Sequence, residues 1–120
     1  MLMRKSAYPI DYDKVCRQTV TVYRYKMGAI SRTVCDRAYL DFRKNRNTDK
    51  TGSREVNSFL LVIPGETQAV YVEDKVLLGV GPAVEDWRQF IPANVPGLVV
   101  VKYVDLKYWG NKIVHTEAGG

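Results

Sequence analysis

Apolar and polar side chains alternate with a period of two along most of this chain, which is typical of β-strands. In residues 18–26, Val20 and Val22 fall on one face, while Tyr23 and Tyr25 fall on the other. This alternation predicts a strand that is buried on one face only and exposes its tyrosines.

Residues 31–44 alternate in the same way and predict a second strand, joined to the first by a turn at 27–29. One face of this strand holds the apolar residues Val34, Ala38, Leu40 and Phe42. Asp36 is the one charged residue on that face, and the alternation does not account for it.

Residues 45–54 carry no apolar side chain and are rich in Asn, Thr, Asp, Gly and Ser. This composition predicts a long exposed loop between two strands. A loop of this length in a small domain is usually either functional or disordered. Residues 56–63, apolar on both faces toward their end, then predict a central strand that Pro64 ends.

The remaining segments continue the pattern of short strands. Residues 70–78 alternate again, with a kink or tight turn expected at 73–74. Residues 84–91 are the only helical candidate, because their apolar residues follow helical spacing and a proline ends the segment. Residues 98–109 and 112–117 predict a closing hairpin.

These elements predict an all-β protein: a small β-barrel or sandwich of about five to seven strands, with one short helix and a long polar loop. A chain of 120 residues has the length of one domain, so we expect a single domain over residues 1–120. Within it, residues 1–16 are expected to form an N-terminal arm and residues 118–120 a mobile tail.

The net charge of +5 is unevenly distributed. Residues 1–54 hold 13 Lys and Arg against 5 Asp, a net of +8, and residues 55–120 hold 5 Lys and Arg against 8 Asp and Glu, a net of −3. This division suits a polyanionic partner, and it equally suits subunits that meet head to tail. A solvated surface with uneven charge is the simpler alternative.

Cysteine and histidine content argues against a fold built on disulfides or metal. Cys16 and Cys35 are expected to be free thiols, because a disulfide-built domain of this size normally carries more cysteines. The single histidine, His115, and the lack of Cys-x-x-Cys or His-x-x-x-His spacing predict no zinc site. No apolar run approaches the roughly 20 residues that span a bilayer, so we expect an intracellular protein with no membrane partner.

The Gly79-x-Gly81 pattern resembles the start of a phosphate-binding turn. Such a turn needs converging backbone N–H groups and a signature that continues to a third glycine or to Gly-Lys-Ser/Thr. Pro82 instead follows and removes a donor. These glycines are therefore interpreted as the end of a strand, and no cofactor is expected.

Candidate catalytic residues are equally poorly placed. Neighbouring carboxylates at Glu73 and Asp74 would point to opposite faces of a strand. His115 lies near the expected mobile tail, lacks a group to orient it, and is interpreted as a surface or interface residue. Cys16 and Cys35 are interpreted as packing residues. We therefore expect no enzyme and no catalytic residues.

Basic residues in and around the polar loop are the candidate functional site. They are Arg43, Lys44, Arg46, Lys50 and Arg54, and the strands before the loop are expected to expose Arg24, Arg37, Tyr23, Tyr25 and Tyr39. Cations interleaved with aromatic rings on a small barrel are typical of single-stranded nucleic-acid binders. The alternatives are that the rings pack on the strand surface and the charges keep an edge soluble, or that this surface contacts another protein.

The order of elements resembles the small neck proteins of tailed bacteriophages, the head-completion or head-closure (stopper) family. The resemblance covers roughly residues 17–117 and rests on five features: RQTVTVYRY, a second long strand that ends at a polar loop, SFLLVIPGETQAVYVEDKVLLG, WRQFIP and KYWGNKIVHTEAGG. Where such proteins commonly show Gly-Asp before the apolar pair, this chain has Glu73-Asp74.

This resemblance implies a virion component made in the host cytoplasm, without catalysis or a cofactor. Its subunits would form a homo-oligomeric ring, of roughly six or twelve copies, stacked on a portal or adaptor protein and followed by a tail terminator or tube protein. DNA would pass through the ring. The loop between the second and third strands, residues 45–53 by position, would project into the channel. The five basic residues would then line the lumen or a subunit contact. A single-stranded nucleic-acid-binding β-barrel is the alternative function.

Overall fold

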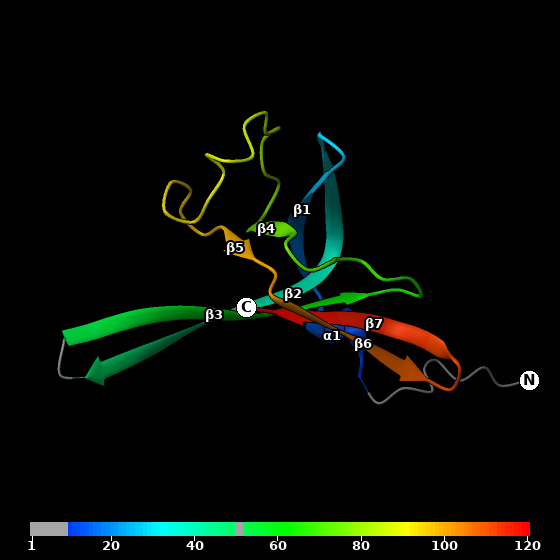
Figure 1. Cartoon of the computed structure of the whole chain (residues 1–120). Coiled ribbons are helices and arrows are strands. Elements are labelled where there is room, and N and C mark those ends of the chain that lie inside the picture. The colour runs from blue at the N-terminus through cyan, green and yellow to red at the C-terminus, as the bar shows by residue number, and fades with distance from the viewer. Residues whose placement is uncertain (1–9, 50–51) are drawn as a thin grey trace, which may run out of the picture.

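The structure, a computed structural model, describes residues 10–49 and 52–120, and of residues 43–57 only the backbone. In the part described, seven strands form one antiparallel sheet in the order β5-β4-β1-β2-β3-β7-β6 (Figure 1). The elements are α1 Tyr12–Val15, β1 Gln18–Lys26, β2 Ala29–Asp49, β3 Gly52–Pro64, β4 Lys75–Leu78, β5 Val99–Val100, β6 Tyr103–Trp109 and β7 Lys112–Gly119. The predicted all-β class is confirmed.

The long strand β2 serves both halves of this sheet. It pairs with β1 as far as Ala38 and with β3 from Tyr39 onwards. Its register with β1 shifts by one residue between Cys35 and Ala38, which places a β-bulge at residues 36–37. A bulge bends a strand and increases its twist. β2 therefore crosses from one half of the sheet to the other, and the sheet curls into a half-barrel (Figure 1).

The bulge also reverses which residues of β2 face the core. Before it, Cys35 packs against the main core and Val34 is 38% exposed. After it, Ala38 and Leu40 are buried. A shift of one residue exchanges the two faces of a strand, so the prediction that Val34 shares the apolar face is wrong. Asp36 lies in the bulge and is exposed, which explains why it did not fit the alternation.

The main core fills the space between the two halves of the sheet. Its buried members are Val20, Val22, Ala38, Leu40, Phe59, Leu61, Ile63, Val70, Val76, Val101 and Ala118. These residues come from β1, β2, β3, β4 and β7 and from the segments beside them. The half-barrel is thus held together by contacts between residues far apart in the sequence.

β1 is buried on both faces, because its remaining residues pack in a second core. Thr21 and Tyr23 are both 0% exposed. Segment 79–98 covers this second face, where Phe90 and Leu98 cluster with Tyr23. The prediction of a half-buried β1 with an exposed Tyr23 is therefore wrong. The covering segment is distant in sequence, so the alternation within β1 could not reveal it.

The two edge strands of the sheet, β5 and β6, follow one another directly in the sequence. β5 pairs with β4 and β6 pairs with β7. Between them, the amide of Val101 donates to the carbonyl of Asp74 at 2.8 Å, and the amide of Lys102 donates to the carbonyl of Gly119 at 2.8 Å. The chain thus passes from one edge of the curled sheet to the other, which joins the two edges at this point.

Residues 45–49 and 52–54 do not form the predicted loop. Residues 50–51 lie outside the described part. β2 continues to Asp49, β3 begins at Gly52, and the two pair without interruption from Asn45–Val56 to Asp49–Gly52. The prediction was wrong because it treated the lack of apolar residues as evidence for a loop. A two-stranded hairpin outside the core needs backbone pairing and no apolar face.

Residues 84–91 do not form the predicted helix and instead fold into turns. The carboxylate of Asp86 accepts hydrogen bonds from the amides of Arg88 and Gln89. The carbonyls of Trp87 and Phe90 accept hydrogen bonds from the Lys75 ammonium at 3.1 and 2.6 Å. Because the side chains of Asp86 and Lys75 form hydrogen bonds with these backbone amides and carbonyls, the segment is held in turns. The one described helix, α1, lies within the predicted N-terminal arm instead.

Three other expectations can be compared with the structure. The turn at 73–74 is present, with Glu73 at φ 77°, and so is the hairpin of β6 and β7. Residues 118–120, expected to be a mobile tail, instead complete β7 through Gly119, and Ala118 is 0% exposed. Ala118 lies opposite Leu61 in the sheet, so this end of the chain is part of the core.

Ala118 is 0% exposed and belongs to the main core, so a larger side chain would meet its core neighbours. We expect Ala118→Leu to lower the free energy of unfolding by about 1–3 kcal/mol, because overpacking displaces core neighbours. The matched control Ala93→Leu, at an exposed position, should change it by less than about 0.5 kcal/mol. Urea unfolding measures both. Equal, small effects of the two substitutions would mean that residue 118 lies outside the core.

Candidate functional site: a basic hairpin and an aromatic groove

The predicted basic residues lie along the hairpin of β2 and β3. By backbone register, the described pairs are Arg43–Ser58, Lys44–Asn57, Arg46–Glu55 and Asn47–Arg54, and Lys50 lies outside the described residues. The structure thus brings the four described positions together on two adjacent strands. We call residues 43–49 and 52–57 the basic ribbon.

The basic ribbon extends beyond the body of the molecule (Figure 1). β7 pairs with β3 only from Leu60 to Pro64, and β1 pairs with β2 only as far as Ala38. Among the described residues, the ribbon therefore has no third strand. A two-stranded hairpin is at best marginally stable alone in water, and its open edges are templates for pairing. The ribbon is therefore suited to contact a partner.

The predicted aromatic and basic platform on the strands before the ribbon is not assembled. Tyr23 is buried, and its hydroxyl donates to the carbonyl of Pro82 at 2.7 Å. Arg24 binds the buried carboxylate of Asp74 at 2.8 Å, which raises the pKa of its guanidinium. Other predicted members are held elsewhere: Arg37 pairs with Asp13, Tyr25 stacks on Trp87, and Tyr39 is half-buried in the other half of the sheet. A continuous surface for stacking bases is therefore not formed by these residues.

The Gly79-x-Gly81 segment is part of the fold, and its amides are not available to a phosphate. The amide of Gly79 donates to the carbonyl of Thr19 at 2.7 Å, and that of Gly81 donates to the hydroxyl of Thr21 at 2.8 Å. A Cβ atom at Gly81 would overlap the hydroxyl of Tyr23. Glycine is therefore explained here by close packing against β1.

His115 is a core residue, which corrects its assignment to a surface or interface. Its side chain is 1% exposed, the hydroxyl of Tyr12 lies 2.5 Å from Nδ1, and the carboxylate of Glu117 lies 3.2 Å from Nε2. The imidazole thereby attaches α1 to the sheet. Cys16, also buried, and Cys35 are free, and burial raises the pKa of both thiols. Within residues 10–49 and 52–120, no group of three or more His, Cys, Asp or Glu could hold a metal ion.

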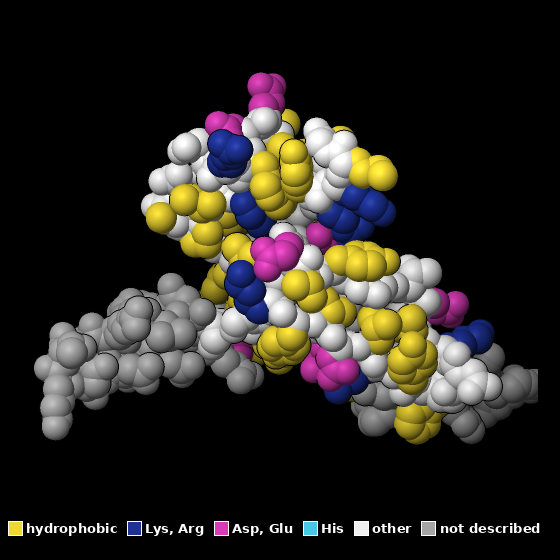
Figure 2. Space-filling model, viewed as in Figure 1, with side chains coloured by type: hydrophobic (Ala, Val, Ile, Leu, Met, Phe, Trp, Pro, Cys, Tyr) yellow, Lys and Arg dark blue, Asp and Glu magenta, His cyan; other side chains and the backbone are white. Residues whose placement is uncertain are grey.

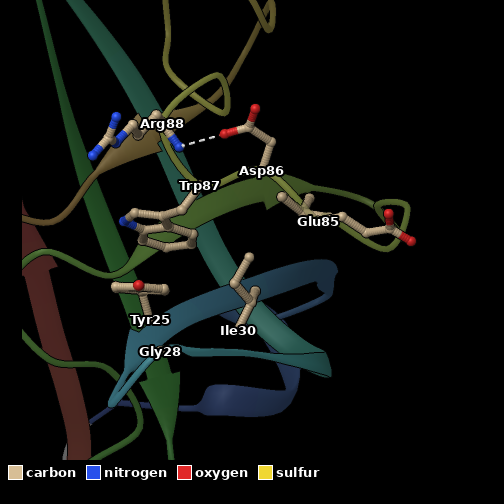
Figure 3. A pocket seen from close by; sticks show the side chains of 8 residues that line it. Tyr25, Gly28, Ile30, Glu85, Asp86, Trp87 and Arg88 are labelled. Carbon is tan, nitrogen blue, oxygen red and sulfur yellow. Dashed lines mark hydrogen bonds between the residues drawn. The ribbon is translucent and has the colours of Figure 1, made fainter.

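A groove near the turn between β1 and β2 was missed by sequence reasoning. It has a volume of about 920 Å³ and is lined by Tyr25, Gly28, Ile30, Val84, Glu85, Asp86, Trp87 and Arg88 (Figure 3). We call it the tip groove. The rings of Tyr25 and Trp87 stack at 5.6 Å with an interplanar angle of 18°. The groove was missed because residues 84–91 were assigned to a helix.

Apolar side chains of the tip groove are bordered by acidic ones. Tyr25 is 51% exposed, and the carboxylates of Glu85 and Asp86 are exposed. In Figure 3, Glu85 and Arg88 extend in opposite directions from the groove. The space-filling view shows hydrophobic side chains among charged ones over the upper part of the body (Figure 2). Exposed apolar surface with a polar rim is typical of interaction sites.

Lys75 holds the wall of this groove in place. Its side chain is 7% exposed, and its ammonium lies 4.0 Å from the centroid of the Trp87 ring. The same ammonium donates the two hydrogen bonds to the carbonyls of Trp87 and Phe90. Burial lowers the pKa of Lys75, and the nearby Glu73 opposes that shift in part. A buried cation thus connects β4 to the turns that carry Trp87.

The lowered pKa of Lys75 predicts how stability depends on pH. The folded protein binds the Lys75 proton less tightly than the unfolded chain does, so this group destabilises the fold while it is charged. That destabilisation is fully present below the pKa that Lys75 has in the folded protein. It is relieved as the pH rises from there toward 10.5, the ordinary pKa of a lysine. The free energy of unfolding should therefore rise with pH in this window relative to that of Lys75→Met. Urea titrations of both proteins measure the difference.

Lys112, which is exposed, provides the control for this pH dependence. The free energy of unfolding of Lys112→Met should follow that of the wild type across the same pH range. A wild-type protein that parallels Lys75→Met, or that loses stability relative to it as the pH rises, would contradict the assigned shift.

Met27 stands at the turn beside the tip groove in an unusual backbone conformation. Its φ is 52°, that of Gly28 is 79°, and the Met27 side chain is 95% exposed. Two-residue hairpin turns with positive φ at both positions favour Asn-Gly, because most side chains are strained there. Here a large apolar residue occupies the position that suits asparagine. Such strain is often found at functional positions.

Replacing Met27 should therefore stabilise the fold. We expect Met27→Asn to raise the free energy of unfolding by about 1 kcal/mol, because asparagine tolerates a positive φ. Met27→Leu, which keeps both the strain and the apolar surface, should leave it nearly unchanged. Thermal unfolding compares the three proteins. A Met27→Asn protein less stable than the wild type would show that Met27 makes stabilising contacts within its own chain.

Comparison of the chain with known protein families, with curated proteins and with solved structures finds no match in any of the three. No helix of the described residues is long and apolar enough to cross a membrane. The chemistry of the basic ribbon and the tip groove is therefore the basis on which function is inferred.

Proposed function

We propose that this chain is a structural subunit of a tailed-bacteriophage neck, a head-completion (stopper) protein without catalytic activity. In this role it forms a homo-oligomeric ring that joins the portal or adaptor to the tail and lets DNA pass. The observation that carries the proposal is the basic ribbon, which extends from a curled all-β body and has no third strand among the described residues.

The charge of the ribbon supports a position next to DNA or next to a neighbouring subunit. Residues 43–54 contain five basic residues against Asp49 alone. Cations that face a channel attract the phosphate backbone without reading its sequence. The same cations would suit an acidic surface of a neighbour. In either case, assembly would stabilise a ribbon that is only marginally stable alone.

The division of charge along the chain supports a closed ring. The net charge of +8 belongs to the part that ends with β2 and the start of β3, and the net charge of −3 belongs to the remainder. Head-to-tail contacts bring two different surfaces of the subunit together, and rings close through contacts of that kind. Cations of the first part that are not paired within the subunit, as Arg24 is with Asp74, would favour such contacts with carboxylates of a neighbour.

Charge reversal on the ribbon tests this function. We expect the triple variant Arg43→Glu, Arg46→Glu, Arg54→Glu to weaken ring formation or DNA retention at least about tenfold, because like charges replace the proposed attraction. Electron microscopy and the mass of the purified chain measure assembly, and packaged-DNA retention in virions measures function. The matched control reverses Lys14, Arg17 and Lys112, which are exposed elsewhere.

The two triple variants carry the same net charge, so their comparison separates position from overall charge. Unchanged assembly and DNA retention in the ribbon variant would exclude the proposed role of these residues. A monomeric wild-type chain that binds single-stranded DNA, with an affinity that falls steeply with salt, would favour the alternative of a nucleic-acid-binding barrel.

A further inference from the structure

We infer that the tip groove docks residues 1–5 of a second copy of this chain. The inference concerns self-association through a surface remote from the basic ribbon. It goes beyond the proposed function, and it would hold for any assembly that the chain builds.

The tip groove has the chemistry to bind a segment that is both apolar and basic. Its apolar surface consists of Tyr25 stacked on Trp87, together with Ile30 and Val84. The lining also holds three exposed charged side chains, Glu85, Asp86 and Arg88, and its two carboxylates outnumber its one cation (Figure 3). Exposed aromatic rings next to acidic groups attract a cation whose neighbours are apolar.

The arrangement of the groove is fixed before any partner binds. Asp86 accepts hydrogen bonds from two amides of its own turn, and the buried Lys75 holds the carbonyls of Trp87 and Phe90. A surface that is already ordered loses less conformational entropy on binding. Met27, 95% exposed in a strained conformation at the turn between β1 and β2, is the chain neighbour of Gly28 in the groove lining.

Residues 1–5, which precede the described part of the chain, have the complementary chemistry. Their sequence is Met-Leu-Met-Arg-Lys, so three apolar side chains are followed by two cations. Methionine is unbranched, adapts to irregular surfaces and makes favourable contacts with aromatic rings. Arg4 and Lys5 would lie near Glu85 and Asp86. No other stretch of five residues in the chain joins three consecutive large aliphatic residues to two consecutive cations.

The position of α1 indicates that the occupant comes from another copy. α1 is attached to the half of the sheet formed by β3 and β7, through Tyr12 to His115 and Cys16 to Val62. Tyr25, Gly28 and Ile30 of the tip groove lie at the turn that joins β1 to β2, and this turn lies far from α1 (Figure 1). In each copy, α1, which follows residues 1–9 in the chain, and the tip groove thus lie on different parts of the surface. Repeating this contact gives the head-to-tail association from which rings are built.

A charge exchange between arm and groove tests the inference in the full chain. The arm variant is Arg4→Glu with Lys5→Glu, and the groove variant is Glu85→Lys. Sedimentation at low salt should show that each variant self-associates at least about tenfold more weakly than the wild type. An equimolar mixture of the two should associate to within about threefold of the wild type, because the reversed arm then meets the reversed groove. Lys14→Glu with Arg17→Glu, the matched control for the arm, should associate as the wild type does.

Three results would overturn the inference. The first is an arm variant that associates as strongly as the wild type. The second is a mixture no stronger than the separate variants, because an arm that acts within its own chain gains nothing from mixing. The third is a wild-type chain that stays monomeric at its highest soluble concentration. The third result would count against the proposed ring as well, whereas the first two concern only the arm and the tip groove and leave the ribbon to be tested by its own variants.

Discussion

The fold depends on a single extra residue in β2. The bulge at residues 36–37 lets one strand pair first with β1 and then with β3, and it exchanges the faces that β2 presents to the core. Because a bulge bends the strand that contains it, the sheet curls and encloses Leu61 and Ala118 against β1. Without that residue, Ala38 and Leu40 would turn away from the core.

A second constraint is the packing of segment 79–98 against the face of β1 that points away from the main core. Segment 79–98 has almost no regular structure, yet it buries Tyr23 and is fixed by hydrogen bonds to side chains of β1 and β4. Lys75 is central to this cover, since its ammonium donates hydrogen bonds to the carbonyls of Trp87 and Phe90. The same contacts position Trp87 beside Tyr25, so the tip groove results directly from how this segment is held.

Alternation along the chain was enough to predict an all-β fold and most strands, including the closing hairpin. It could not reveal that β1 is buried on both faces, because Tyr23 is covered by Phe90 and Leu98 from a distant segment. The polar residues 45–54 were assigned to a loop because pattern analysis detects strands by their apolar face, and this ribbon lies outside the core. Charge alone was enough to identify the basic residues of the site. The tip groove could not be predicted, because it depends on the turns that position Trp87.

In the proposed function, the basic ribbon is an element of assembly that a neighbour stabilises. Amide hydrogen exchange in residues 43–49 and 52–57, measured on the dilute chain and on the assembled one, tests this claim most directly. We expect the ribbon amides to exchange fast in the dilute chain and to be strongly protected after assembly, with the amides of β1 protected in both. Equally strong protection of the ribbon in a monomeric chain would contradict it, because the ribbon would then need no neighbour.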